Sequence, residues 1–129
     1  MIAVDTNIII RLFTKDDAAQ YKKAYELFEQ PSVFISTTIL QEVEWVLRFC
    51  YEFSNAAINQ ALTTLVGLPN VELDKTQTIS AALKLHQQGL DFSDALHLTQ
   101  ATTCDTFYTF DKKFIHQCKN NPLYSVQKP

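Results

Sequence analysis

Residues 1–13 have the sequence MIAVDTNIIIRLF, in which a short apolar segment, Met1–Val4, runs directly into Asp5. A second segment, Thr106–Phe110, is rich in Phe, Tyr and Thr and runs directly into Asp111. Residues of these types favour buried strands. The two stretches therefore predict strands whose carboxyl ends each meet an aspartate.

Predicted strands and helices alternate along the rest of the chain. Apolar spacing and capping residues predict further strands at Val33–Ile35, Val71–Leu73 and, at an edge, Tyr124–Val126. They predict helices at Asn7–Phe13, from Asp16 or Asp17 to Glu29, from Ser36, Thr37 or Thr38 to Tyr51, from Ser54 or Asn55 to Gly67, at Thr76–Gln88 and Ser93–Thr102, and from Asp111 onward. Short apolar strands between helices are typical of a parallel sheet covered on both faces. We therefore predict an α/β fold, a three-layer α/β/α sandwich with a four- or five-stranded, mainly parallel sheet.

The size and charge of the chain restrict its class. Its 129 residues fit a single domain spanning residues 1–129. A net charge of −3 argues against a basic nucleic-acid coat protein, but it does not exclude a nuclease with an acidic active site. Three cysteines without a C-x-x-C pair indicate reduced thiols, and there is no signal-peptide or membrane-span pattern. We expect a cytoplasmic protein.

Four acidic residues are expected to meet at one edge of the sheet. In an open parallel sheet, ligands bind outside the carboxyl ends of the strands, where Asp5 and Asp111 are predicted to lie. Asp94 lies near the start of a predicted helix. Glu42 lies about two turns into the helix after the second strand, beside a predicted apolar stripe made of Ile39, Val43, Val46 and Cys50. Glu44 is predicted to face solvent.

Carboxylates that share a cleft repel one another unless a cation binds or some are protonated. Ligand sets made only of oxygen suit Mg²⁺ or Mn²⁺. Such an ion can activate a water molecule that attacks a phosphodiester bond. The alternative is that Asp5, Asp94 and Asp111 only cap helices, as aspartates at helix starts usually do, and that Glu42 is an ordinary surface residue.

Four segments resemble the motifs of PIN domains, and their order holds over the whole chain. They are Val4–Asn7, Ile35–Glu42, Leu90–His97 and Thr109–Asp111. The compact form resembles the toxin of bacterial VapBC toxin–antitoxin pairs. The resemblance implies a Mg²⁺- or Mn²⁺-dependent endoribonuclease that forms a homodimer and is inhibited by a small VapB-like antitoxin.

The resemblance also implies roles for individual residues. Asp5 and Asp94 would be the main metal ligands, and Glu42 and Asp111 would complete the site by binding a second metal or orienting water. Asp91 would be a fifth acid. The groups that hold the carboxylates in place would be Asn7 and Thr109.

Alternatives to a ribonuclease stay open at this point. Two glycines cannot form a phosphate-binding loop, and Asn7 stands where an aspartyl-phosphate enzyme would need a second aspartate. A non-catalytic binding module of PIN shape and a DNA nuclease remain. Basic residues near Asp5 and Asp111 are candidates for RNA phosphate contacts: Arg11, Lys15, Lys112 and Lys113. Trp45, Phe49 and Tyr51 are expected to pack in the core, and the alternative is that they line a groove for a dimer or antitoxin.

Overall fold

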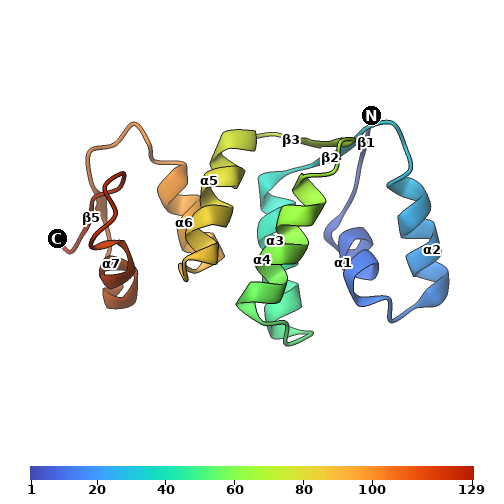
Figure 1. The fold of residues 1–129 in the computed structure, drawn as a ribbon, viewed down its shortest axis with the longest axis horizontal. Helices are drawn as coiled ribbons and strands as arrows, with labels where there is room; N and C mark the ends of the chain where they lie inside the picture. The colour runs from blue at the N-terminus through green and yellow to red at the C-terminus, as the bar shows by residue number, and fades with distance from the viewer. The chain divides into compact units, whose positions relative to one another are not determined.

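The computed structural model describes all 129 residues, which form two compact units, Met1–Thr76 and Gln77–Pro129. The elements of the first unit, labelled in Figure 1, are β1 (Ile2–Ala3), α1 (Thr6–Thr14), α2 (Ala18–Leu27), β2 (Val33–Ile35), α3 (Thr37–Phe49), α4 (Asn55–Val66) and β3 (Val71–Leu73). Those of the second are α5 (Thr76–Gln87), which begins at the boundary, α6 (Phe92–Thr99), β4 (Phe107–Tyr108), α7 (Lys112–Cys118) and β5 (Val126–Gln127).

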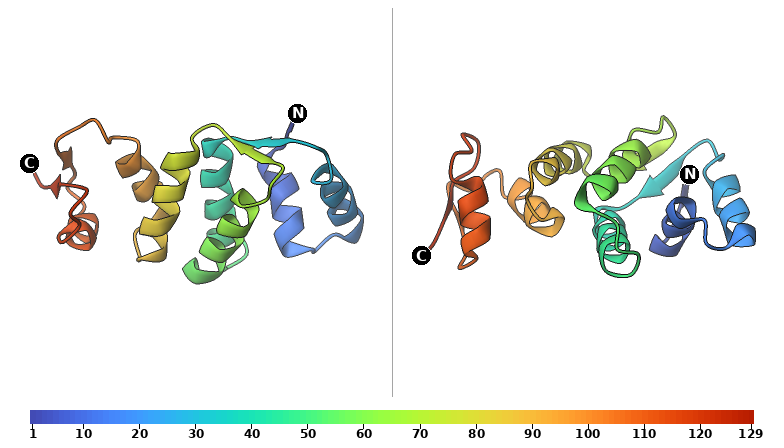
Figure 2. Two further views of the ribbon diagram at one scale, coloured as in Figure 1. Left: turned by 45° about the horizontal axis from the view of Figure 1, so that its top comes forward. Right: turned by 60° about the horizontal axis from the view of Figure 1, so that its bottom comes forward.

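The first unit contains a three-stranded parallel sheet in the order β1-β2-β3. Val33 of the central strand β2 is in register with Ile2 of β1 on one side and with Val71 of β3 on the other. Parallel neighbours need crossover connections, which α1 with α2 and α3 with α4 supply. Figure 2 shows α1 and α2, in blue, side by side within this unit. The carboxyl ends of all three strands consequently meet at one edge of the sheet.

The buried face of α3 differs from the predicted stripe. The residues of this helix that are buried are Thr37, Leu40, Val43, Glu44 and Leu47. Cys50 is exposed, and Ile39 and Val46 are only half-buried. The helix buries the side that carries its two central leucines, because these have more apolar area to remove from water than the cysteine.

The prediction that Glu44 faces solvent is wrong. Only 1% of Glu44 is exposed. Arg48, one helical turn further on, donates from Nε to Oε2 of Glu44 at 2.7 Å and from Nη2 to Oε1 at 3.1 Å. A buried carboxylate is tolerable when a charged partner binds both of its oxygens.

The second unit contains a two-stranded parallel sheet, in which Phe107 of β4 is in register with Val126 of β5. Gly89, with φ at +110°, joins α5 to α6 in a backbone conformation that suits glycine. The core of this unit includes Ile79, Phe92 and Leu96.

The α/β class, the parallel pairing and the number of strands agree with the prediction. Every strand pair is parallel, and the five strands are divided between the two sheets. A single sheet with helices on both faces stays a prediction.

Candidate active site

Asp5 follows β1 and is the N-cap of α1. Its Oδ1 accepts a hydrogen bond from the backbone N–H of Thr6 at 2.7 Å, and its side chain is exposed. One oxygen is therefore engaged in a local bond that satisfies a helix-terminal amide. Capping and ligation are compatible, because a carboxylate has several lone pairs.

Asp91 and Asp111 are also N-caps, in the second unit. Asp91 Oδ1 accepts from the N–H of Asp94 at 3.1 Å, and Asp111 Oδ1 accepts from the N–H of Phe114 at 3.1 Å. Asp5 and Asp111 thus cap helices, as the alternative to metal binding had expected. Asp94 is not a cap but stands in the first turn of α6, where the helix dipole favours a negative charge.

The surroundings of Asp94 change how tightly its carboxyl holds a proton. Burial raises the pKa of its carboxyl above the usual value, and the charges of Asp91 and Asp111 raise it further, partly opposed by His97. Burial and the charge of Asp94 also raise the pKa of the Cys118 thiol. The charges of two neighbouring carboxylates therefore act on Asp94.

For the remaining predicted site residues, Glu42, Asn7 and Thr109, the structure shows either an exposed side chain or a bond to the backbone. Glu42 is exposed on α3, and Asn7 is exposed in the first turn of α1. Thr109 contacts the backbone of Asp111 rather than its carboxylate, because Thr109 Oγ1 accepts from the N–H of Asp111 at 3.0 Å. This bond fixes the start of α7.

The four predicted acids are divided between the units. Asp5 and Glu42 belong to the first unit, and Asp94 and Asp111 to the second. Neither unit by itself gathers three His, Cys, Asp or Glu side chains closely enough to hold a metal ion. The four-acid site therefore stays a prediction.

Arg11 is held in a polar network at the carboxyl-terminal end of α1. Its Nη1 donates to Oδ1 of Asp16 at 3.0 Å and to the hydroxyl of Tyr51 at 3.2 Å, and its Nε donates to Gln20 at 2.6 Å. The Tyr51 hydroxyl also donates to Oδ2 of Asp16 at 3.1 Å. Tyr51 and Asp16 raise the pKa of Arg11. Arg11 therefore has a structural role.

The other basic residues differ in their surroundings. Lys15 Nζ lies over the ring of Tyr21, at 5.2 Å from its centre. Lys112 and Lys113 are exposed in the first turn of α7, directly after Asp111.

The prediction that the aromatic residues pack in the core is wrong for two of them. Trp45 and Phe49 of α3 are 52% and 58% exposed, so they are not core residues. Their rings lie 5.2 Å apart, and the Arg48 guanidinium lies 4.4 Å from the centre of the Phe49 ring.

Asp74 is an acid that the sequence analysis missed. It directly follows β3, at the same edge of the sheet as the end of β1. Its Oδ1 accepts from both the N–H and the hydroxyl of Thr37, the first residue of α3. The rule that selected Asp5, an acid directly after an apolar strand, also applies to Asp74 after Val71–Leu73.

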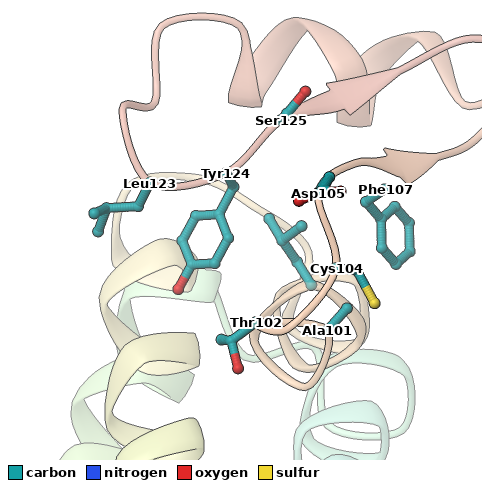
Figure 3. Close-up of a pocket in the computed structure, with 9 residues that line it drawn as sticks. Ala101, Thr102, Cys104, Asp105, Phe107, Leu123, Tyr124 and Ser125 are labelled. Atoms are coloured by element: carbon teal, nitrogen blue, oxygen red, sulfur yellow. The ribbon is translucent and has the colours of Figure 1, made fainter.

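The second unit also contains a cavity of about 230 Å³. It opens at the amino end of β4, and its lining includes Cys104, Asp105 and Tyr124 (Figure 3). Asp111 follows the opposite, carboxyl end of β4, and none of the predicted acids lines the cavity.

None of the helices is long and apolar enough to cross a membrane.

No match was found among curated proteins. Among solved structures, the chain is similar to one of VapBC2 from Rickettsia felis bound to a DNA fragment from its promoter, with 20% sequence identity over 99% of this chain and 98% of that chain. The TM-score is 0.40, so this likeness supports no conclusion about partners. A family model described as PIN domain matches residues 2–120, which include every predicted acid. The chain therefore belongs to the PIN domain family.

Proposed function

We propose that the chain is a Mg²⁺- or Mn²⁺-dependent endoribonuclease whose active site consists of Asp5, Glu42, Asp94 and Asp111. PIN domains are generally nucleases, and the matched segment contains all four acids. The observation that supports the proposal most directly is the raised pKa of Asp94, which is caused by burial and by two neighbouring carboxylates. Acids with a perturbed pKa are frequent at catalytic sites.

The donor chemistry of these residues fits a hard divalent ion. All four side chains offer carboxylate oxygens, the ligands that Mg²⁺ and Mn²⁺ prefer. A cation would also relieve the repulsion that Asp94 experiences from Asp91 and Asp111. Asp5 and Asp94 are proposed to hold the ion.

The chain's own residues would prepare the site for hydrolysis. When bound, the ion supplies Lewis acidity and lowers the pKa of a water molecule. Glu42 and Asp111 would orient the attacking water. Thr109 would keep Asp111 in place through its bond to the Asp111 backbone, and Asn7, next to α1's first residue, would support Asp5.

Contacts to the RNA backbone would come from basic residues near the acids. Lys112 and Lys113 are the best placed of the four candidates, since both are exposed and adjacent to Asp111. The guanidinium of Arg11 already binds three side chains, and the Lys15 ammonium lies against Tyr21. We therefore assign Arg11 and Lys15 a weaker contribution.

We further propose that the two units form one PIN domain, and that the protein is the toxin of a toxin–antitoxin pair. The family match supports the first point because it runs through both units. The resemblance of the four motifs to VapBC toxins supports the second, and it implies a homodimer and a VapB-like antitoxin as partners. Co-purification with the product of an adjacent short reading frame would test the antitoxin.

Cleavage of total tRNA with and without Mn²⁺ tests the enzymatic proposal. Wild-type protein should cut RNA only with the ion, and the ion should raise its melting temperature. Asp5→Asn and Asp94→Asn should abolish cleavage and most of the melting shift. Asp105→Asn, at an exposed aspartate outside the proposed site, is the matched control and should behave as wild type.

Two results would contradict the ribonuclease proposal. The absence of both cleavage and a melting shift would favour a non-catalytic binding module. Cutting of single-stranded DNA in place of RNA would favour a DNA nuclease, because the choice between RNA and DNA depends on contacts to the 2′-hydroxyl.

A further inference from the structure

Asp74 connects the end of β3 to the start of α3. Its Oδ1 accepts from the N–H of Thr37 at 3.0 Å and from the Thr37 hydroxyl at 2.7 Å. Thr37 is only 7% exposed, so both of its donors depend on a protein partner. Hydrogen bonds to an ionised carboxylate are stronger than those between neutral groups.

A second residue caps the same helix in a different way. Ser36 Oγ accepts from the N–H of Ile39 at 3.3 Å, a local bond within one turn. Ser36 therefore satisfies a helix amide without connecting α3 to any other element. The bonds of Asp74, by contrast, join residues that are 37 positions apart in the chain. The pairing of β2 with β3 brings the start of α3 close to β3, and of the two capping groups only Asp74 bonds the first residue of the helix to the end of that strand.

We propose that Asp74 is a positioning residue, which holds Thr37 and thereby sets the location of Glu42 at the carboxyl edge of the first sheet. Glu42 is five residues after Thr37, and at 1.5 Å per residue it lies about 7.5 Å further along the helix axis. A displacement of the helix start is therefore transmitted to Glu42. This inference rests on the proposed function, since it concerns the placement of one of the proposed acids.

Four variants separate positioning from simple helix capping. Asp74→Ala removes both bonds, whereas Asp74→Asn keeps an oxygen that can accept them. Ser36→Ala removes the local cap and leaves Asp74 in place. Glu72→Gln removes an exposed charge from the same strand and is the matched control for charge. If Asp74→Ala does not fold, Thr37→Val takes its place, because it removes only the hydroxyl donor.

The first measurement is amide hydrogen exchange in the metal-free protein. Asp74→Ala should accelerate exchange at Thr37 and change the amide chemical shift of Glu42, and Asp74→Asn should restore both. The second measurement is calorimetric binding of Mn²⁺ alone. Asp74→Ala should weaken binding by roughly tenfold, the lower end of the effect of losing a group that supports a metal ligand. Ser36→Ala and Glu72→Gln should bind Mn²⁺ like wild type.

The inference is overturned if Asp74→Ala leaves the exchange at Thr37 and the shift of Glu42 unchanged. It is also overturned if Ser36→Ala weakens Mn²⁺ binding as much as Asp74→Ala, because loss of capping alone would then explain the effect. Wild-type protein that bound neither Mn²⁺ nor Mg²⁺ would contradict the proposed function. The exchange measurement would still decide whether Asp74 holds the start of α3.

Discussion

Asp94 differs from the other proposed acids in the balance of forces on its charge. Asp5 and Asp111 each accept a hydrogen bond from a backbone N–H at the start of a helix. The Asp94 carboxylate accepts no such bond. Its pKa is raised mainly by burial and further by the charges of Asp91 and Asp111. A side chain that holds its proton more tightly in the folded chain makes stability dependent on pH.

The sign of this dependence follows from proton binding. Because the pKa of Asp94 is raised on folding, the folded chain binds the proton more tightly than the unfolded chain does. The contribution of Asp94 to stability is therefore fully present below the ordinary aspartate pKa of about 4 and is lost as the pH rises through the raised value. Asp94→Asn has no such loss, so its melting temperature relative to wild type should increase between acidic and neutral pH in metal-free buffer.

Thermal melts over a pH series with a chelator present would measure this difference. The difference in melting temperature between Asp105→Asn and wild type should not change with pH in this way. A difference in melting temperature between Asp94→Asn and wild type that stayed constant with pH would show that folding does not raise the pKa of Asp94. Addition of Mg²⁺ should stabilise wild type relative to Asp94→Asn at neutral pH.

Helix α3 contains an ion pair in which one side chain, Glu44, is buried and the other, Arg48, is half-buried. The Glu44 side chain is 1% exposed and that of Arg48 is 31% exposed. Loss of Arg48 would leave a buried carboxylate without its bidentate partner, whereas replacement of both residues by apolar ones would remove the desolvation penalty. The pair should therefore respond asymmetrically to single and double substitution.

Arg48→Met is expected to lower the free energy of unfolding by about 3 kcal/mol, the usual result of breaking a buried pair. The double variant Glu44→Leu/Arg48→Met should recover most of that loss. Urea unfolding measures both, and Lys22→Met, at an exposed lysine of α2, should change stability by less than about 0.5 kcal/mol. A double variant as unstable as the single one would contradict the explanation based on an unpaired buried charge.

At the scale of the whole molecule, the proposal of one domain predicts one unfolding transition. The segment matched by the PIN family runs from residue 2 to residue 120 and so includes most of both units. Calorimetry should give a single peak with an unfolding enthalpy of roughly 90 kcal/mol at the midpoint, which is typical for a domain of this length. The calorimetric enthalpy should also equal the van't Hoff enthalpy. Two separate peaks, one for each unit, would contradict the single domain.

Local rules predicted much of the fold and part of the candidate site. Strands appear at Val33–Ile35 and Val71–Leu73 as expected, and Asp5 and Asp111 cap helices as expected. The same rules failed on α3, where Glu44 was assigned to solvent. Apolar residues lie on more than one side of that helix, so the pattern alone did not identify the buried side.

The sequence by itself determined where helices begin to within two residues, which strands are apolar and which acids follow them, because those features depend on residues close together in the chain. Only the tertiary structure decided which side of α3 is buried, that Arg48 compensates the buried charge of Glu44, and that Asp74 holds Thr37. The physical reason is that burial and long-range hydrogen bonds depend on which elements pack together. Spacing along a single helix or strand does not contain that information.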